Sequence, residues 1–311
     1  MVGLRLREPA AALLVSGFAV DDGRIGPTPP HWRDAPAGAI GREEAYLLLI
    51  GSLLGDPFGR HTQQGGRLVH NVVPTKGQEQ QQVSSNSSAT LSWHTEDGFC
   101  EYRPDYVGLL CLRNPDHAVT RYLDVSRLPV PAQDRRLLGE PVYRIRSDYS
   151  HDPAQNPASA ASAEVFDRIG AYDERIAVLS VDPQDPVVRL DADFTDAPAG
   201  PEHAAALARL CRQVEASLAD VVLEPGDLLL IDNFRGARPR ALRRPLRRDG
   251  PLAQAPLRRP GPAPLPHGPA RRDRAAAVRL TTGRIRRRLT LRAASAPGPG
   301  CPRSPPAAAS A

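Results

Sequence analysis

The chain contains no aromatic residue after Phe234, and residues 236–311 contain no lysine and only two acidic residues. These 76 residues instead hold 18 arginines and 14 prolines, with a net charge of +16. A segment without aromatic side chains, rich in proline and with high net charge, cannot bury enough surface to fold. The sequence therefore predicts a folded domain over residues 1–235 and a disordered Arg/Pro/Ala-rich tail over residues 236–311.

The absence of aromatic residues from the tail also argues against nucleic acid as a specific partner. Arg-rich, acid-poor segments bind phosphate polymers through charge alone. Proteins that hold single strands add aromatic side chains on which the bases stack, and the tail has none. We therefore expect no specific nucleic-acid partner.

Cysteine is scarce as well, since the four residues Cys100, Cys111, Cys211 and Cys301 are far apart in the sequence. This spacing argues against a disulfide framework or a zinc site. No apolar run reaches the roughly 20 residues of a membrane-spanning helix. Together these absences favour a protein of the reducing cytoplasm that does not bind membranes. We expect the first apolar run, residues 12–20, to be a core strand rather than a signal peptide, which suggests an incomplete N-terminus.

His94-Thr95-Glu96 is the most informative motif of the body. It lies within residues 89–99, which alternate in the manner of a β-strand. Residues i and i+2 of a strand point to the same face, so His94 and Glu96 would present an imidazole beside a carboxylate. These are two of the three ligands in the 2-His-1-carboxylate triad that holds Fe(II) with open positions. The plain alternative is a surface pair that binds no metal.

Short strands and few helices are expected along the rest of the body. Apolar runs predict strands over residues 69–73, 106–112, 142–145, 176–181 and 228–232. Helical spacing of apolar residues predicts helices over residues 43–54 and 204–218. This pattern favours a mainly β fold with flanking helices, either a β-sandwich or a jelly roll.

The segment from Val83 to Asp116, which contains Trp93-His-Thr-Glu-Asp-Gly-Phe99, resembles the clavaminate synthase-like (TauD/TfdA-type) Fe(II)/2-oxoglutarate-dependent oxygenases. It is similar in particular to the L-arginine β-hydroxylases of peptide-antibiotic biosynthesis. Further matches follow in the same order between residues 10 and 235, among them Thr62-Gln-Gln64, Arg189-Leu-Asp-Ala-Asp-Phe194 and Ile231-Asp-Asn233. The resemblance implies a double-stranded β-helix, with Fe(II) as metal and 2-oxoglutarate and O2 as co-substrates.

The same resemblance implies which residues face the metal and the substrate. His94 and Glu96 would bind the iron, and Glu96 would also touch the substrate amine. Gln63 and Ser84 match positions that hold the amino-acid end of the substrate. Asp148 is a weaker candidate for substrate contact, and Gln63 has a plain alternative as an ordinary loop amide.

Asp191 and Asp193 match the carboxylates that hold the guanidinium in relatives acting on arginine. Carboxylates suit this planar group, because its five N–H donors form charge-assisted hydrogen bonds with them. The plain alternative is that both are turn residues, since aspartate is common in turns.

The chain departs from the resemblance after Asn233. In the family, the strand equivalent to residues 228–233 runs into a Val-His-Gly-Arg element with the second histidine. A later segment supplies an arginine to 2-oxoglutarate. Here the sequence continues as Phe234-Arg-Gly-Ala-Arg-Pro-Arg240, and the next histidine is His267. The third ligand is therefore absent, and the residues that would bind 2-oxoglutarate are unknown.

A change of reading frame explains this departure. Shifted by one base, the codons of Gly236-Ala-Arg-Pro239 permit Val-His-Gly-Arg. Those of residues 240–256 permit Ala-Pro-Phe-Ala-Ala-Arg-Tyr-Asp-Gly-Thr-Asp-Arg-Trp-Leu-Lys-Arg-Leu, the missing family segment. We infer an insertion or deletion near codon 235, genuine or introduced in sequencing, which the nucleotide sequence of codons 230–260 tests.

The sequence thus predicts hydroxylation of a free amino acid, with C3 of L-arginine favoured, by an enzyme impaired through loss of the distal histidine and arginine. The expected partner is the small-molecule substrate. Two alternatives stay open: a hydroxylase of another amino acid, such as asparagine or a cyclised arginine, and a degenerate, non-catalytic arginine-binding protein.

Overall fold

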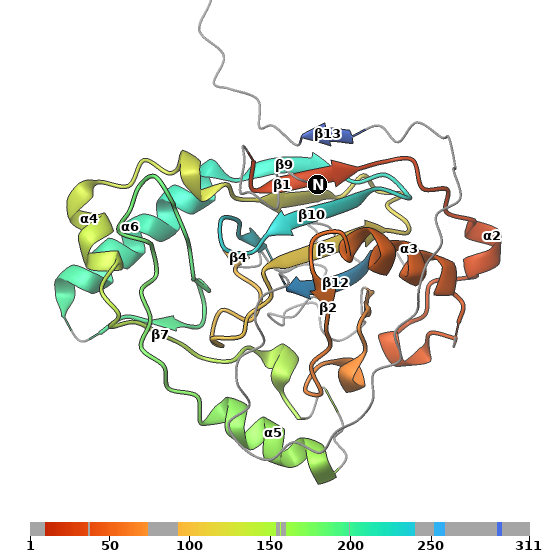
Figure 1. Cartoon of the computed structure of the whole chain (residues 1–311), viewed down its shortest axis with the longest axis horizontal. Helices are drawn as coiled ribbons and strands as arrows, with labels where there is room; N and C mark the ends of the chain where they lie inside the picture. The colour runs from red at the N-terminus through yellow and green to blue at the C-terminus, as the bar shows by residue number, and fades with distance from the viewer. Residues whose placement is uncertain are drawn as a thin grey trace, which may run out of the picture.

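The computed structural model describes residues 10–36, 38–73, 93–153, 156, 160–198, 200–239, 252–258 and 291–293. An antiparallel sheet of order β13-β1-β10-β5-β12-β2, with β3 paired to β12, forms the centre of the molecule (Figure 1). Its strands are β1 (Ala12–Val15), β2 (Asp56–Pro57), β3 (His70–Val72), β5 (Tyr106–Cys111), β10 (Leu228–Asp232), β12 (Leu252–Arg258) and β13 (Leu291–Ala293).

Strand β10 is apolar at four successive positions because both faces of the sheet are covered. Leu228 and Leu230 pack in one cluster with residues of helix α3 (Gly41–Gly51). Leu229 and Ile231 pack in the cluster on the opposite face, with residues of the paired strands β6 (Val119–Tyr122) and β9 (Ala219–Val222). A strand buried on both faces reads as a continuous apolar run, as residues 228–231 do.

Smaller elements surround this sheet. Strand β4 (Trp93–His94) pairs with β11 (Arg238–Pro239), and β7 (Arg144–Ile145) pairs with β8 (Thr195–Asp196). The helices are α2 (Asp22–Ile25), α4 (Ala132–Leu138), α5 (Ala160–Gly170) and α6 (Pro201–Ser217), besides α3. Short 3-10 turns are η1 (Trp32–Asp34), η2 (Gln64–Gly66), η3 (Val125–Arg127) and η4 (Tyr149–His151).

Helix α6 packs at one end of the molecule beside α4 (Figure 1). Its buried residues Ala206, Leu210 and Val214 recur every four positions and so lie on one face. Arg209 donates to both carboxylate oxygens of Asp134 in α4, at 2.8 and 2.7 Å. The apolar stripe and this ion pair together position α6.

Most of the predicted elements are present, but two predicted strands are not as expected. Residues 176–181 form only isolated bridges, Ile176 with Tyr143 and Leu179 with Val188. The backbone of residues 176–181 forms hydrogen bonds with three different segments, because Val178 and Leu179 also donate to Leu138. No continuous strand pairing therefore forms along these residues. Of the strand predicted within residues 89–99, the described residues form only β4, and the chain turns after His94.

Three short strands fall within the predicted tail. Strand β12 lies between β5 and the pair of strands β2 and β3, β13 lies against β1, and β11 lies against β4. At these three strands, the structure differs from the predicted disordered tail. Strand edges such as that of β5 present N–H and C=O groups that another backbone can satisfy whatever its side chains. The other residues after 239 lie outside the described part of the chain.

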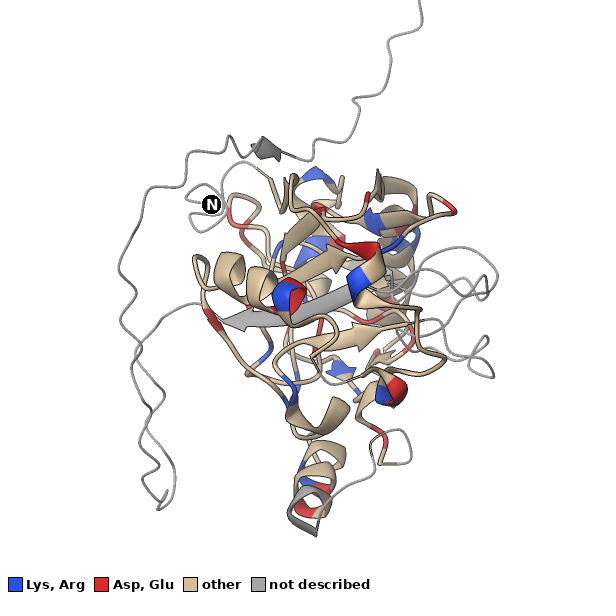
Figure 2. Ribbon diagram, turned by 90° about the vertical axis from the view of Figure 1, so that its right-hand side faces the viewer, with Lys and Arg blue, Asp and Glu red and all other residues tan. Residues whose placement is uncertain are grey.

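Charged residues are distributed over the helices and loops around a sheet that is mostly uncharged (Figure 2). Both signs are interspersed, and pairs such as Arg24 with Glu43 link neighbouring elements. Among the described residues, no helix has the length and apolar character required to cross a membrane.

Candidate functional site

His94 and Glu96 converge at the end of strand β4. The Nε2 of His94 lies 3.4 Å from Oε2 of Glu96, and the two side chains are 5% and 14% exposed. Glu96 begins a turn in which Asp97 has a φ of +50°. The structure thus brings imidazole and carboxylate together as the sequence predicts, although through a turn rather than through the alternation of a strand.

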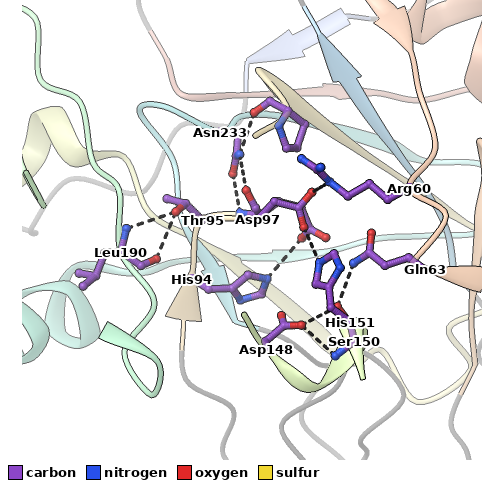
Figure 3. A network of polar contacts seen from close by, with 12 residues as sticks. Arg60, Gln63, His94, Thr95, Asp97, Asp148, Ser150, His151, Leu190 and Asn233 are labelled. Atoms are coloured by element: carbon purple, nitrogen blue, oxygen red, sulfur yellow. Dashed lines mark hydrogen bonds and ion pairs between the residues drawn. The ribbon is translucent and has the colours of Figure 1, made fainter. Parts of the chain in front are cut away.

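Thr95 points away from this pair and fastens β4 to the segment with Asp191 (Figure 3). The backbone N–H of Thr95 donates to the Leu190 carbonyl at 2.8 Å, and Leu190 N–H donates to Thr95 Oγ1 at 3.2 Å. His94 and Asp191 face each other in an antiparallel bridge. Opposed residues of such a bridge share a face, with Cβ atoms roughly 4.5–5.5 Å apart, so Asp191 lies beside His94.

Asn233, directly after β10, fixes the backbone of Glu96. Its Oδ1 accepts from Glu96 N–H at 2.7 Å, and its Nδ2 donates to the carbonyls of Glu96 and Pro104 at 2.9 and 2.8 Å. Asn233 is itself buried. The position of the Glu96 carboxylate therefore depends on a residue 137 positions away.

Asp97, which directly follows Glu96, is the centre of a buried polar network (Figure 3). Its Oδ1 lies 3.0 Å from Nε2 of His151, and its Oδ2 pairs with the guanidinium of Arg60. The Nδ1 of His151 lies 2.8 Å from Oγ1 of Thr62. Burial lowers the pKa of Arg60 while Asp97 raises it, and the net direction is upward. This network joins three segments of the chain at the residue that follows Glu96.

Gln63 and Asp148, two of the predicted substrate residues, meet at Ser150. The Nε2 of Gln63 donates to Oγ of Ser150 at 2.8 Å. Asp148 Oδ1 accepts from the backbone N–H and the hydroxyl of Ser150, at 2.8 and 2.5 Å. Ser150 was not predicted, because serine in a polar loop carries no sequence signal of its own.

Asp191 and Asp193 differ in their surroundings. Asp191 is 4% exposed, and its Oδ1 accepts from the backbone N–H groups of Asp193 and Phe194 at 3.1 and 3.3 Å. Asp193 is exposed. Asp191 thus closes a turn, as its plain alternative predicts, and also lies opposite His94. Ser84, the remaining predicted substrate residue, lies outside the described residues.

His70 in β3 also lies near the site, as Ser150 does, and the sequence did not predict this. It is 7% exposed, and its Nε2 has no hydrogen-bond partner within the described part of the chain. Burial lowers the pKa of His70, against the opposing attraction of the Glu96 and Asp97 carboxylates. The sequence could not show that β3 lies near the turn after β4, because residues 74–92 separate them.

The described side chains at this site provide two of the three donors that an iron triad needs. Imidazole nitrogen and carboxylate oxygen are the donors that such a triad needs, and His94 and Glu96 bring one of each. Over the described ranges, however, no group of three His, Cys, Asp or Glu side chains is arranged to hold a metal. The residues present therefore do not fit a complete Fe(II) site.

Comparison with known proteins relates the site to a family. Residues 33–237 match the model of the taurine catabolism dioxygenase TauD/TfdA family. The L-ornithine/L-arginine 3-hydroxylase of Catenulispora acidiphila is 44% identical over 76% of this chain and 72% of that protein. The enduracididine beta-hydroxylase of Streptomyces hygroscopicus is 36% identical over 74% and 71%.

Solved structures agree with the sequence relatives. The non-heme iron oxygenase OrfP, in complex with Fe, succinate and (3S)-hydroxy-L-Arg, superposes with a TM-score of 0.77 at 35% identity. The match covers 83% of this chain and 79% of OrfP. The predicted jelly-roll fold is thereby confirmed. The chain belongs to the TauD/TfdA family of Fe(II)/2-oxoglutarate-dependent dioxygenases.

Proposed function

We propose that this protein is an amino-acid hydroxylase for C3 of free L-arginine whose iron site is impaired by the sequence that follows Arg235. The observation that carries the proposal is the bridge between His94 and Asp191. It places a segment with two carboxylates directly beside the imidazole and carboxylate of the candidate metal site. A cationic side chain held by that segment would lie next to the reacting centre.

In the reaction of the family, the co-substrate 2-oxoglutarate is consumed together with dioxygen and the amino-acid substrate. Dioxygen and 2-oxoglutarate give succinate and carbon dioxide, one oxygen atom enters succinate, and the other becomes the new hydroxyl group of the substrate. The iron and the co-substrate supply the oxidation when bound, so the task of the protein is to orient the substrate.

Asp191 and Asp193 give this site its preference for a cation. A guanidinium offers five N–H donors in a plane and stays charged at every physiological pH. Gln63 and Ser150, which are hydrogen-bonded to each other, are suited to the polar amino-acid end. Glu96 would receive the substrate amine. The relatives named for 3-hydroxylation and β-hydroxylation support C3 as the position of attack.

Binding rather than turnover tests this assignment, because the iron site is incomplete. Calorimetry with L-arginine should show binding by this chain. Asp193→Ala should weaken binding by about 10–100-fold, the loss of one charge-assisted hydrogen bond of roughly 1.5–3 kcal/mol. Asp196→Ala is the matched control, because Asp196 is an exposed carboxylate nearby that pairs with Arg146 instead.

The same titrations decide between arginine and an amide substrate. If the Asp193→Ala and Asp191→Ala variants bind L-asparagine as well as the parent does, and L-arginine binds to none of the three, the guanidinium assignment is wrong. A cyclised arginine retains the cationic group, so direct competition with L-arginine ranks the two.

A non-catalytic arginine-binding protein is the second candidate. The observation that favours it is the absence of a third metal donor among the described side chains. Calorimetry with and without Fe(II) and 2-oxoglutarate separates the candidates. Arginine affinity that is unchanged by both additions favours the binding protein, and affinity that rises with them favours the hydroxylase.

A further inference from the structure

We infer that His151 is a positioning residue, which sets the segments proposed to hold the amino-acid end of the substrate relative to the turn that carries Glu96. This inference deepens the proposed function and rests on it for the identity of the substrate. It assigns no direct substrate contact to the imidazole of His151. The ring acts through two hydrogen bonds and through its neighbour in the chain.

Two adjacent side-chain contacts join the segment of Gln63 to the segment of Ser150. The Nε2 of Gln63 donates to the Ser150 hydroxyl at 2.8 Å (Figure 3). Beside it, Oγ1 of Thr62 lies 2.8 Å from Nδ1 of His151, and these two side chains are buried. Because Thr62 precedes Gln63 and His151 follows Ser150, a shift of either buried side chain would move a residue proposed to meet the substrate.

Asn156 makes a third contact between the same two segments. Its Oδ1 accepts from the backbone N–H of Gln64 at 2.8 Å, and its Nδ2 donates to the Ser150 carbonyl at 2.6 Å. Asn156 is buried as well. Among the described residues, its hydrogen-bond partners lie in these two segments. Asn156 therefore joins them to each other without joining either of them to the turn of Glu96.

His151 extends the connection to the turn after β4. Its Nε2 lies 3.0 Å from Oδ1 of Asp97, the residue directly after Glu96 (Figure 3). An ionised carboxylate only accepts hydrogen bonds, so this nitrogen donates to Asp97. The Nδ1 of the neutral ring then accepts from the Thr62 hydroxyl. One imidazole therefore sets the spacing between Thr62 and Asp97, with a donor on one side and an acceptor on the other.

Asp97 passes this constraint on to Glu96 through the backbone. The φ of Asp97 is +50°, and a residue other than glycine keeps such a left-handed conformation where its surroundings hold it. Besides His151, the carboxylate pairs with Arg60, whose carbonyl accepts from the N–H of Gln63 at 2.9 Å. Both segments at the amino-acid end are thus tied to the residue that follows Glu96.

Packing fixes the orientation of the His151 ring. Phe99 meets it edge to face, with ring centroids 4.9 Å apart and an interplanar angle of 79°. Phe99 is itself buried in the apolar cluster that covers this end of the molecule. A planar ring held by two hydrogen bonds and one aromatic contact has little freedom to turn, so it serves as a rigid spacer between the two sides of the site.

Hydrogen exchange of the full-length chain tests the connection without any ligand. His151→Phe keeps a planar ring and removes both hydrogen bonds. It should speed exchange of the Gly98 and Cys100 amides, which bond within the turn after β4, by about 10–100-fold, the factor that a hydrogen bond to a charged group represents. Asn156→Ala is the matched control. It loosens the contact between the two segments and should leave both exchange rates unchanged.

Calorimetry with the two enantiomers of arginine separates positioning from general stability. L- and D-arginine share the guanidinium and differ in how the amino-acid end is arranged. His151→Phe should lower the ratio of L- to D-arginine affinity by about 3–10-fold, because Gln63 and Ser150 are misplaced. His151→Gln should restore the ratio, since glutamine offers both a donor and an acceptor. His203→Phe, which breaks a contact of 2.8 Å with Glu140 in another part of the molecule, should not change it.

Either of two results would overturn the inference. One is a folded His151→Phe variant whose Gly98 and Cys100 amides exchange no faster than those of Asn156→Ala. The other is an enantiomer ratio that His151→Phe leaves at the value of the parent. If His151→Phe does not fold, Thr62→Val removes one of the two hydrogen bonds and takes its place in both measurements. A parent that binds neither enantiomer would refute the proposed function, and the exchange rates would then decide the role of His151 alone.

Discussion

The Nε2 of His151 lies 3.0 Å from the Oδ1 of Asp97, and both side chains are buried. Asp97 follows Glu96 in the turn after β4, and His151 ends the turn η4, which also carries Ser150. This contact therefore links the candidate metal ligand to the segment proposed to hold the amino-acid end of the substrate. A disturbance on one side of the site is expected to reach the other through it.

Asp97→Asn should lower the free energy of unfolding by about 1–3 kcal/mol, because buried hydrogen bonds to a charged group are lost. Asparagine keeps the shape of the side chain and tolerates the positive φ of this position, so the change isolates the charge. Urea unfolding measures the effect. Glu224→Gln is the control, since the exposed His117–Glu224 pair should change stability by less than about 0.5 kcal/mol. Equal losses of stability in the two variants would show that the buried network stabilises the fold no more than an exposed ion pair does.

Asn233→Ala should weaken Co(II) binding by the protein with a restored reading frame by roughly 10–100-fold, as loss of an outer-sphere partner does. The reason is that Asn233 holds the backbone of Glu96 on both sides. Asn114 makes three comparable bonds away from the site, to Ala118 and Leu223. Asn114→Ala should therefore reduce stability without changing metal affinity. Similar losses of affinity in both variants would contradict a positioning role for Asn233.

Asp134→Asn should destabilise the protein at neutral pH, and the difference should shrink in acid. The hydrogen bond from Arg209 holds the pKa of Asp134 below its usual value. A carboxylate with a lowered folded-state pKa stabilises fully above its unfolded pKa, near 3.9. That contribution is lost as the pH falls through the folded-state pKa. Urea midpoints of parent and variant between about pH 6 and pH 3 measure the difference, and a gap independent of pH would refute this account.

Several elements of the fold, and the proximity of His94 to Glu96, could be predicted from the sequence because they depend on local patterns. Continuous apolar residues identify β10, and residues spaced by four identify α6. His94 and Glu96 are two positions apart, so a strand and the observed turn both bring them together. The fold class also rested on collinear matches across the body, which short-range patterns alone do not supply.

The polar network was not predictable because its members are far apart in the sequence. Asp97 is separated from Arg60 by 37 positions and from His151 by 54. His151 has no ligand-like spacing in the sequence, and the structure makes it a buried partner of Asp97. Such contacts depend on how the segments pack, and no periodicity in a single sequence records them.

Mass spectrometry of L-arginine incubated with Fe(II), 2-oxoglutarate and the protein tests the central claim most directly. The chain as it stands should leave arginine unchanged. A gene whose reading frame is restored after codon 235 should yield arginine heavier by one oxygen atom at C3, with one succinate per product. A frame-restored protein that is folded and binds Fe(II), yet leaves arginine unmodified, would contradict the account.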